Sequence, residues 1–286
     1  MGSPREGVGT LVLVATPIGN LGDISPRAVD ALRLADVIAC EDTRRTGLLL
    51  QRLGVAKHGR FVVANEHTEA AAARQVAELL GQGLTVAVVT DAGTPGVSDP
   101  AARLVQAAHD EGHTVSTVPG AVAAIAALVI SGLPTDRFVV EGFLPRTGAE
   151  RRRRLADVAA EHRTVVLYEA PHRLARTLGD LVEACGPDRP LAVARELTKL
   201  HEELWRGSLG EAVARAAEVA PRGEYVLVLG GRPAPPAPSG DDVDVAIRTA
   251  LATGASVKDA AAQVADALAL PRRQVYERAL DLRSPS

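Results

Sequence analysis

The sequence predicts two α/β domains followed by a small helical extension, and three observations support this fold class. Short apolar segments alternate with helical patterns from residue 10 to about residue 231. The stretch RPAPPAPSG at 232–240 is too rich in Pro to form a packed element. Residues 241–286 have the pattern of three short helices. We therefore expect a first α/β domain over 10–133, a second over 134–231, a linker over 232–240 and a helical extension over 241–286.

The first α/β domain has apolar runs short enough for strands buried in a parallel sheet. The expected strands are Leu11–Ala15, Val37–Cys40, Phe61–Ala64, Thr85–Val89 and Thr114–Val118. Ser25 and Pro26 supply the N-cap and first residue of a helix that runs to Leu34. Gly54 and Gly112 end the helices that begin near Thr43 and Ser98.

The second α/β domain repeats the alternation with two to three helices. Its expected strands are Phe138–Glu141, Thr164–Tyr168, Leu191–Glu196, His201–Arg206 and Tyr225–Leu229. Thr147 and Glu150 have the spacing of a capping box for a helix that runs through Glu161. A second helix begins after Pro171 and ends at Gly186.

The C-terminal helices are expected at 243–253, 257–268 and 271–282, and the last two resemble a helix-turn-helix. A helical bundle without nucleic-acid contact fits the same spacing. Residues 271–286 carry more Arg than acidic side chains, and Arg272 and Arg273 stand at the start of the last helix. This surplus of positive charge favours RNA as the partner.

Composition limits the classes of function. The net charge of −3 means that binding to nucleic acid requires a local basic patch. No apolar run reaches the length of a membrane span, and the N-terminus lacks a signal core, so we expect a cytoplasmic protein without a membrane partner. Cys40 and Cys185 are expected to be packed thiols. Gly112 separates His109 from His113, so we expect surface histidines and no metal site.

The stretch TDAGTPGVSDP at 90–100 follows an expected buried strand and precedes a helix. Such a turn lies at the carboxyl edge of the sheet, where open α/β folds bind small molecules; an ordinary strand-to-helix loop is the alternative. Loops after the other strands, at 16–20, 41–44 and 119–120, reach the same edge. The chain has no GxGxxG, GxxxxGK or GxSxG motif. Walls of Ala, Val and Gly without nearby cations favour an adenosyl ligand over a triphosphate.

Four consecutive cations, Arg151, Arg152, Arg153 and Arg154, fall in the first turns of an expected helix. They oppose the helix dipole, which a phosphate-rich partner would explain. A solvated charged face is the alternative. The ionisable groups that follow the expected strands at 164–168 and 191–196 have a similar alternative, because they could form a surface salt-bridge network without any role in the cleft.

Several segments in order resemble one family. They are TPIGNLGDI (16–24), EDTRRTGLLL (41–50), TDAGTPGVSDP (90–100), VPGAVAAIAAL (118–128), SGLPTDRFVVEGFLP (131–145), YEAPHR (168–173) and ARELTKLHEE (194–203). Together they are similar to the ribosomal RNA small subunit methyltransferase I family, which belongs to the tetrapyrrole methylase superfamily. The resemblance runs through about residues 10–231, and the C-terminal helices resemble an extension that many members carry.

The resemblance implies S-adenosylmethionine (SAM) in a cleft between two α/β domains, usually in a homodimer. It also implies 2′-O-methylation of a cytidine in the decoding region of 16S rRNA, either free or in the small ribosomal subunit. The matching SAM-binding positions are Pro17, Asp91, Gly93, Thr94, Pro95, Val97, Ser98, Gly120, Ala121, Val122, Tyr168, Leu197 and Glu224. Ala101 and the pair Ala121–Val122 depart from the family pattern, but these replacements are small and apolar.

The reaction asks for alignment of a ribose hydroxyl and removal of its proton. Asp42, Glu196 and Lys199 are the candidate bases or orienting groups, and the sequence does not choose among them. Lys199 would need a lowered pKa to act as a base. The expected RNA contacts are Arg44, Arg151, Arg152, Arg153, Arg154, Arg272 and Arg273. The alternative functions are a tetrapyrrole methylase and an adenosyl-ligand sensor without enzymatic activity.

Overall fold

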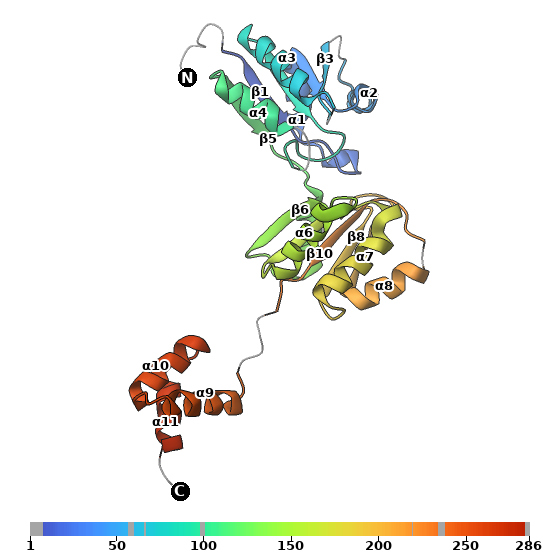
Figure 1. Cartoon of the computed structure of the whole chain (residues 1–286). Coiled ribbons are helices and arrows are strands. Elements are labelled where there is room, and N and C mark those ends of the chain that lie inside the picture. Colours follow the sequence, from blue (N-terminus) through green and yellow to red (C-terminus); the bar gives the residue numbers. More distant parts are fainter. Residues whose placement is uncertain are drawn as a thin grey trace. The chain divides into compact units, whose positions relative to one another are not determined.

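The computed structural model describes residues 8–56, 60–65, 67–97, 101–218, 220–233 and 238–283. The chain divides into two compact units, Met1–Arg232 and Pro233–Ser286. The first unit contains two five-stranded sheets and the second contains three helices (Figure 1). We call the regions built on the two sheets the first and second α/β domain. The predicted fold class is confirmed.

The first sheet is wholly parallel, in the order β3-β2-β4-β1-β5. Its strands are β1 (Thr10–Val14), β2 (Val37–Cys40), β3 (Arg60–Val63), β4 (Thr85–Val89) and β5 (Thr114–Val118). The connecting helices are α1 (Pro26–Leu34), α2 (Thr43–Arg52), α3 (Glu69–Gly81) and α4 (Ala101–Asp110). One apolar cluster joins α1 and α2 to the sheet and another joins α3 and α4 to it. Both faces are thus covered, which explains why these strands are almost continuously apolar.

The second sheet is mixed, in the order β6-β7-β10-β8-β9, and only β6 and β7 are parallel neighbours. Its strands are β6 (Phe138–Phe143), β7 (Thr164–Glu169), β8 (Pro190–Arg195), β9 (Glu203–Ser208) and β10 (Tyr225–Leu229). One face packs against α6 (Gly148–Ala160), α7 (Pro171–Cys185) and α8 (Leu209–Glu218). The other face packs against α5 (Ala123–Ser131), although α5 follows a strand of the first sheet.

The C-terminal unit consists of α9 (Gly240–Ala252), α10 (Val257–Ala267) and α11 (Arg272–Arg283) around their own apolar core. Ser239 and Asp242 form a capping box at the start of α9, and Ser256 caps α10 by accepting a hydrogen bond from the Asp259 amide. These caps and the separate core give the unit its own source of stability.

Three expectations about local structure are wrong. Thr147 occupies the N-cap of α6, but its side chain makes no capping bond, because Gly148 (φ +86°) turns the chain between Thr147 and Glu150. β9 begins at Glu203 instead of His201, because residues 196–202 form a hydrogen-bonded loop. The side chain of His113 is only 5% exposed, so it is not a surface histidine, whereas His109 is exposed as expected. The expected start of α4 at Ser98 lies outside the described residues.

Cys40 and Cys185 are both free thiols, as predicted. Burial raises the pKa of Cys40, which keeps its thiol in the unreactive protonated form. Among the helices of the described residues, none combines the length and the apolar character needed to cross a bilayer.

The buried centre of the second sheet predicts a large cost for truncation there. Leu227 in β10 is fully buried, so Leu227→Ala should lower the free energy of unfolding by ~2–5 kcal/mol through lost contacts and a cavity. Leu34→Ala is the control, because Leu34 is 77% exposed, and its effect should stay within about 0.5 kcal/mol. Urea titration of each variant measures both values, and equal effects would contradict this account of the core.

Candidate functional site

The described residues enclose a cavity of about 450 Å³ within the first unit, lined from both α/β domains. This size lies within the usual range for small-molecule sites. We call it the central cavity. From the first α/β domain its walls include Ile18, Glu41, Arg45, Thr90, Asp91, Ala92, Gly93, Thr94, Val97, Val122 and Ala123. From the second they include Phe143, Tyr168, Glu169, Ala170, Pro171, Leu197, Glu224, Tyr225 and Val226.

The floor of the central cavity is formed where the loops after β1 and β4 cross. The Thr16 amide donates to the Gly93 carbonyl at 2.9 Å, and the Gly93 amide donates to the Thr16 carbonyl at 3.2 Å. Gly93 has φ +89°, a conformation that side chains rarely adopt. The Thr94 hydroxyl then donates to the Ala121 carbonyl at 3.0 Å, which ties this turn to the start of α5. The turn is therefore fixed by backbone bonds on both sides.

An acidic corner lies at the carboxyl ends of β2 and β4. Glu41 accepts hydrogen bonds from the Thr90 hydroxyl and from the Asp91 amide. Arg45 in α2 pairs with Asp91 at 3.0 Å. Burial, together with the nearby Glu41 carboxylate, raises the pKa of Asp91 above its ordinary value. This corner offers a ligand two carboxylates held in place by the loops of the first sheet.

The opposite wall carries the aromatic side chains. Tyr168 at the end of β7 and Phe143 at the end of β6 have ring centroids 5.5 Å apart. The Tyr168 hydroxyl accepts a hydrogen bond from the Ala124 amide at 3.3 Å. Because Ala124 belongs to α5, this bond joins the aromatic wall to the helix that follows the first sheet. The second α/β domain thus contributes aromatic rings to the cavity wall, together with the carboxylates of Glu169 and Glu224.

Eight of the thirteen predicted SAM-binding residues line the central cavity: Asp91, Gly93, Thr94, Val97, Val122, Tyr168, Leu197 and Glu224. Pro17, Pro95 and Ala121 adjoin lining residues in the chain, and Ser98 lies outside the described residues. Gly120 supports the site from behind, because a Cβ there would lie 2.7 Å from the Ala15 Cβ. The structure therefore brings the predicted segments of both domains to one cavity.

The three candidate catalytic residues do not line the cavity. Asp42 caps α2, and hydrogen bonds from the Arg44 side chain and backbone amide lower its pKa. Lys199 lies 2.8 Å from both Glu196 and Glu224. Burial acts to lower the pKa of Lys199, but these two hydrogen bonds outweigh it and raise the pKa. The bond from Lys199 in turn lowers the pKa of Glu196.

The loop that holds Lys199 has a strained backbone. Glu196 and Thr198 have φ of 51° and 65°, in the left-handed region that favours glycine. The Glu224 amide donates to the Glu196 carboxylate at 2.9 Å, and the Asn20 amide donates to the Thr198 hydroxyl at 3.1 Å. These bonds keep the strained conformation and join the loop to the segment after β1.

Sequence reasoning placed Glu41 at the rim of the cleft, in the loop 41–44, but did not name it as a binding residue. It missed Arg45, which follows this loop and also lines the cavity, and it missed Phe143. Nothing in the spacing of Phe143 distinguished it from a core aromatic, because its role depends on the pairing of β6 with β7.

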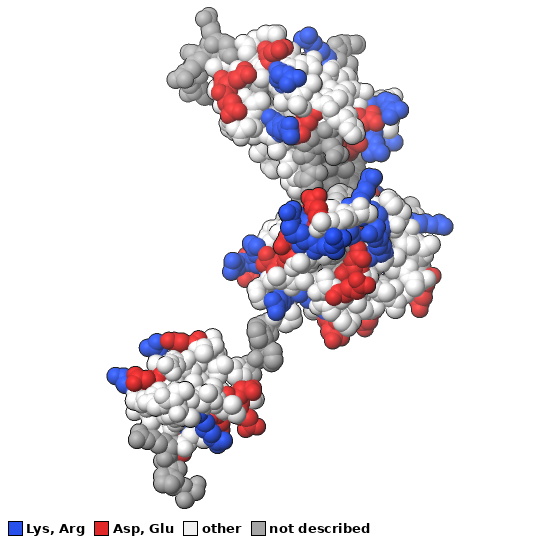
Figure 2. Space-filling view, in the orientation of Figure 1, with Lys and Arg blue, Asp and Glu red and all other residues white. Residues whose placement is uncertain are grey.

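The arginines that were expected to bind RNA differ in their exposure and in their ion-pair partners. Arg152 and Arg153 are exposed on α6, and Lys and Arg side chains gather over this part of the second α/β domain in Figure 2. Arg151 is only 3% exposed, and Arg154 pairs with Glu141 at 2.5 Å. Arg44, Arg272 and Arg273 are exposed but pair with Asp42, Asp266 and Glu277. Burial excludes Arg151 from a surface contact, so the four cations do not act as one group.

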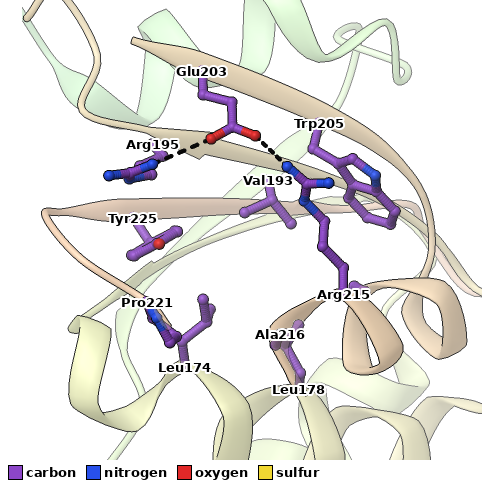
Figure 3. A pocket seen from close by; sticks show the side chains of 11 residues that line it. Leu174, Leu178, Val193, Arg195, Glu203, Trp205, Arg215, Ala216, Pro221 and Tyr225 are labelled. Carbon is purple, nitrogen blue, oxygen red and sulfur yellow. Dashed lines mark hydrogen bonds and ion pairs between the residues drawn. The ribbon is translucent and has the colours of Figure 1, made fainter. Parts of the chain in front are cut away.

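A second pocket, of about 50 Å³, lies between β8, β9, β10 and the helices α7 and α8 (Figure 3). It has room for only a few water molecules. Its charged groups satisfy one another, because Glu203 bridges Arg195 and Arg215. The central cavity is the candidate ligand site because loops of both α/β domains line it. Among the described residues, no group of three or more His, Cys, Asp or Glu side chains is arranged to hold a metal ion.

Comparisons with known proteins agree with this architecture. The profile of the Tetrapyrrole (Corrin/Porphyrin) Methylases family matches residues 10–213, and that of the RsmI C-terminal HTH domain matches residues 237–283. A solved structure of uroporphyrin-III-C-methyltransferase from Thermus thermophilus has a TM-score of 0.54 at 23% identity and covers 77% of this chain and 94% of its own. Cobalt precorrin-4 methyltransferase has a TM-score of 0.59 at 18% identity, covering 80% and 97%. At these identities, the likeness shows the fold.

Sequence relatives are closer. Ribosomal RNA small subunit methyltransferase I of Synechocystis sp. is 46% identical over 96% of this chain and 99% of its own length. The protein of the same name from Mycobacterium tuberculosis is 46% identical over 96% of both chains. These identities extend over nearly the whole chain and confirm the resemblance predicted from the motifs. The chain belongs to the ribosomal RNA small subunit methyltransferase I family, within the tetrapyrrole methylases.

Proposed function

We propose that this protein transfers a methyl group from SAM to the ribose 2′-oxygen of a cytidine in the decoding region of 16S rRNA, in the cytoplasm. The observation that carries the proposal is the central cavity, where the predicted loops of both α/β domains meet in a chain of this family. The acceptor is 16S rRNA, free or in the small ribosomal subunit.

The central cavity suits SAM by its chemistry. Ile18, Val97, Val122 and Leu197 provide apolar walls for a flat base and an alkyl chain. Asp91 and Glu41 offer carboxylates for hydroxyl and ammonium donors. A further tetrapyrrole methylase structure, the Thermus thermophilus uroporphyrin-III C-methyltransferase, was solved with S-adenosyl homocysteine, and it is 21% identical to this chain with a TM-score of 0.54. These features support SAM as the cofactor.

The protein itself must hold the acceptor ribose and remove a proton. When bound, SAM supplies a methyl group already activated by its positively charged sulfur, so alignment is the main requirement. Lys199, with its raised pKa, stays protonated near neutral pH and serves better as an orienting cation than as a base. Asp42 and Glu196, with lowered pKa values, are weak proton acceptors. Asp91 has a raised pKa and lies in the cavity wall, but it pairs with Arg45 and is assigned to SAM, so it is not proposed as the base.

The RNA surface centres on the exposed face of α6. Within the described part of the chain, neither Arg152 nor Arg153 has a hydrogen bond or an ion pair, so both are free for phosphate. Arg44 near the cavity and, in the C-terminal unit, Arg272 and Arg273 are further proposed contacts to RNA. A tetrapyrrole substrate or a sensor role would not require these exposed cations. Their presence favours rRNA methylation over both alternatives.

We also propose a homodimer that covers the outer face of α5. This helix, AAIAALVIS, has no charged residue, and helices that are apolar on all sides are normally buried on all sides. One side packs against the second sheet, but Val129, Ile130 and Ile125 are 65%, 42% and 39% exposed. A second copy of the chain, presenting the same apolar face, would bury them in a two-fold contact.

Methyl transfer tests the function directly. Wild-type protein with SAM and 16S rRNA or small subunits should yield one 2′-O-methylcytidine per rRNA, measured by nucleoside mass spectrometry. Gly93→Val should abolish the product, because its Cβ would lie 3.4 Å from Ile18 in the cavity wall and the branched side chain would fill the space through which the ligand approaches. SAM at ~100 times its Kd should stabilise the wild type by about 2.7 kcal/mol, and the variant not at all.

Gly83→Val is the matched control. Gly83 has φ +78° but open space around its Cβ, so this variant suffers the same backbone strain far from the cavity. It should keep SAM binding and methyl transfer. Methylation of a base atom, or no product from wild type on either acceptor, would contradict the proposed reaction.

RNA titrations at several salt concentrations test the basic surface. Arg152→Ala/Arg153→Ala should weaken binding and lower the salt slope by about 0.7–0.9 for each lost phosphate contact. SAM affinity should not change. Arg27→Ala/Arg33→Ala on α1 removes the same charge elsewhere and is the control. A chain ending at Gly231 should keep SAM binding and bind RNA more weakly; unchanged RNA binding would exclude a role for the C-terminal unit.

Light scattering coupled to size exclusion tests the dimer. The wild type should have twice the chain mass of 29.8 kDa, and Val129→Asp should have the mass of one chain, because the carboxylate would be buried in the apolar contact. Val245→Asp, at a position 61% exposed on α9, should remain dimeric. A monomeric wild type would contradict the proposal.

A further inference from the structure

Arg151 is buried in α6 and satisfied by groups of the second α/β domain. Its Nε donates to Asp180 at 2.8 Å and one terminal nitrogen donates to the Pro145 carbonyl at 2.8 Å. The other terminal nitrogen donates to the Thr177 hydroxyl at 3.0 Å. A guanidinium held on three sides in this way cannot turn outward to a phosphate without giving up these bonds, including the close ion pair with Asp180.

The contact to Thr177 continues toward the central cavity. Thr177 is 1% exposed, and its hydroxyl donates to Glu169 at 2.5 Å. The direction is unambiguous, because a guanidinium only donates and a carboxylate only accepts. The single hydroxyl proton of Thr177 therefore points at Glu169, and Arg151 fixes it there.

Glu169 is itself part of the cavity wall. Its other carboxylate oxygen accepts from the Ala170 amide at 2.8 Å and lies 3.1 Å from Nε of Arg173. The segment from Tyr168 to Pro171, between β7 and α7, lines the cavity. The conformation of this wall thus depends on a buried carboxylate that Thr177 and Arg173 hold from opposite sides.

We infer that Arg151 and Thr177 are positioning residues that set the wall at 168–171 for the adenosyl ligand. This inference rests on the proposed function, since it concerns SAM in the central cavity. Arg151 and Arg173 pair with Asp180 and Glu169, and Arg176 lies 3.9 Å from Asp180 at the exposed edge of this cluster. Loss of the Thr177 hydroxyl leaves one Glu169 oxygen buried without its donor, and the carboxylate can relieve this only by moving the wall.

Thr177→Val tests the inference, because it keeps the shape of the side chain and removes only the hydroxyl. The Kd for SAM, measured by calorimetry well below the unfolding temperature, should rise about tenfold. A change of this size is typical of the interaction energy between residues in direct contact. Thr177→Ser should restore the Kd to within about twofold. The RNA salt slope should not change in either variant, since Arg152 and Arg153 stay exposed.

Thr164→Val separates positioning from general stability. Thr164 is 2% exposed, and its hydroxyl donates to the Pro134 carbonyl at 2.7 Å, at the end of β7 opposite Glu169. This variant should lose comparable stability and keep wild-type SAM affinity. Unchanged SAM affinity in Thr177→Val, or an equal loss in Thr164→Val, would overturn the inference. Absence of SAM binding by the wild type would overturn the proposed function and this inference together.

Discussion

The packing of α5 against the second sheet is the contact on which the site depends. The helix leaves the first sheet after β5, yet Ala124, Ala127 and Leu128 are buried against Val226 and Val228 of β10. The two alanines leave room for the helix to pack closely against the strand, and Leu128 fills the remaining space. Because the cavity is walled by both sheets, its width follows from this one apolar interface, and the bond from the Ala124 amide to Tyr168 fixes the rotation of the helix.

The strands and most helix limits could be predicted from the sequence, because a strand that is buried on both faces of its sheet appears as a short continuous run of apolar residues. All ten strands were expected, and β10 was expected with its correct limits. The clearest errors in the predicted strand limits arose where side-chain hydrogen bonds outweigh the hydrophobic pattern. His201 and Glu202 fit a strand, but the bonds of Thr198 and Lys199 hold them in a loop. The mixed direction of the second sheet was not predicted, since a run of apolar residues carries no information about the direction of its neighbour.

The site was predictable at the level of loops and not at the level of individual side chains. Glycines and small residues at strand ends indicated which turns meet a ligand, and these turns do meet. Arg151 shows the limit of this reasoning, because consecutive cations resemble one surface patch in a sequence. On a helix, neighbours point about 100° apart, so Arg151 faces α7 while Arg152 and Arg153 face solvent. Only the packed structure shows that the helical periodicity places Arg151 inside the domain and places Arg152 and Arg153 on its surface.

The left-handed backbone at Glu196 and Thr198 implies that the stability of the fold and the order of the cavity rim make opposite demands on these two positions. Each such residue stores roughly 1–3 kcal/mol of unfavourable conformational energy. Glycine at either position would release that energy and make the fold more resistant to heat, but it would remove the side chain that holds Lys199 or Asn20. Selection for thermal tolerance alone would therefore remove side chains that order the rim of the cavity. Enzymes commonly show such a compromise between stability and activity.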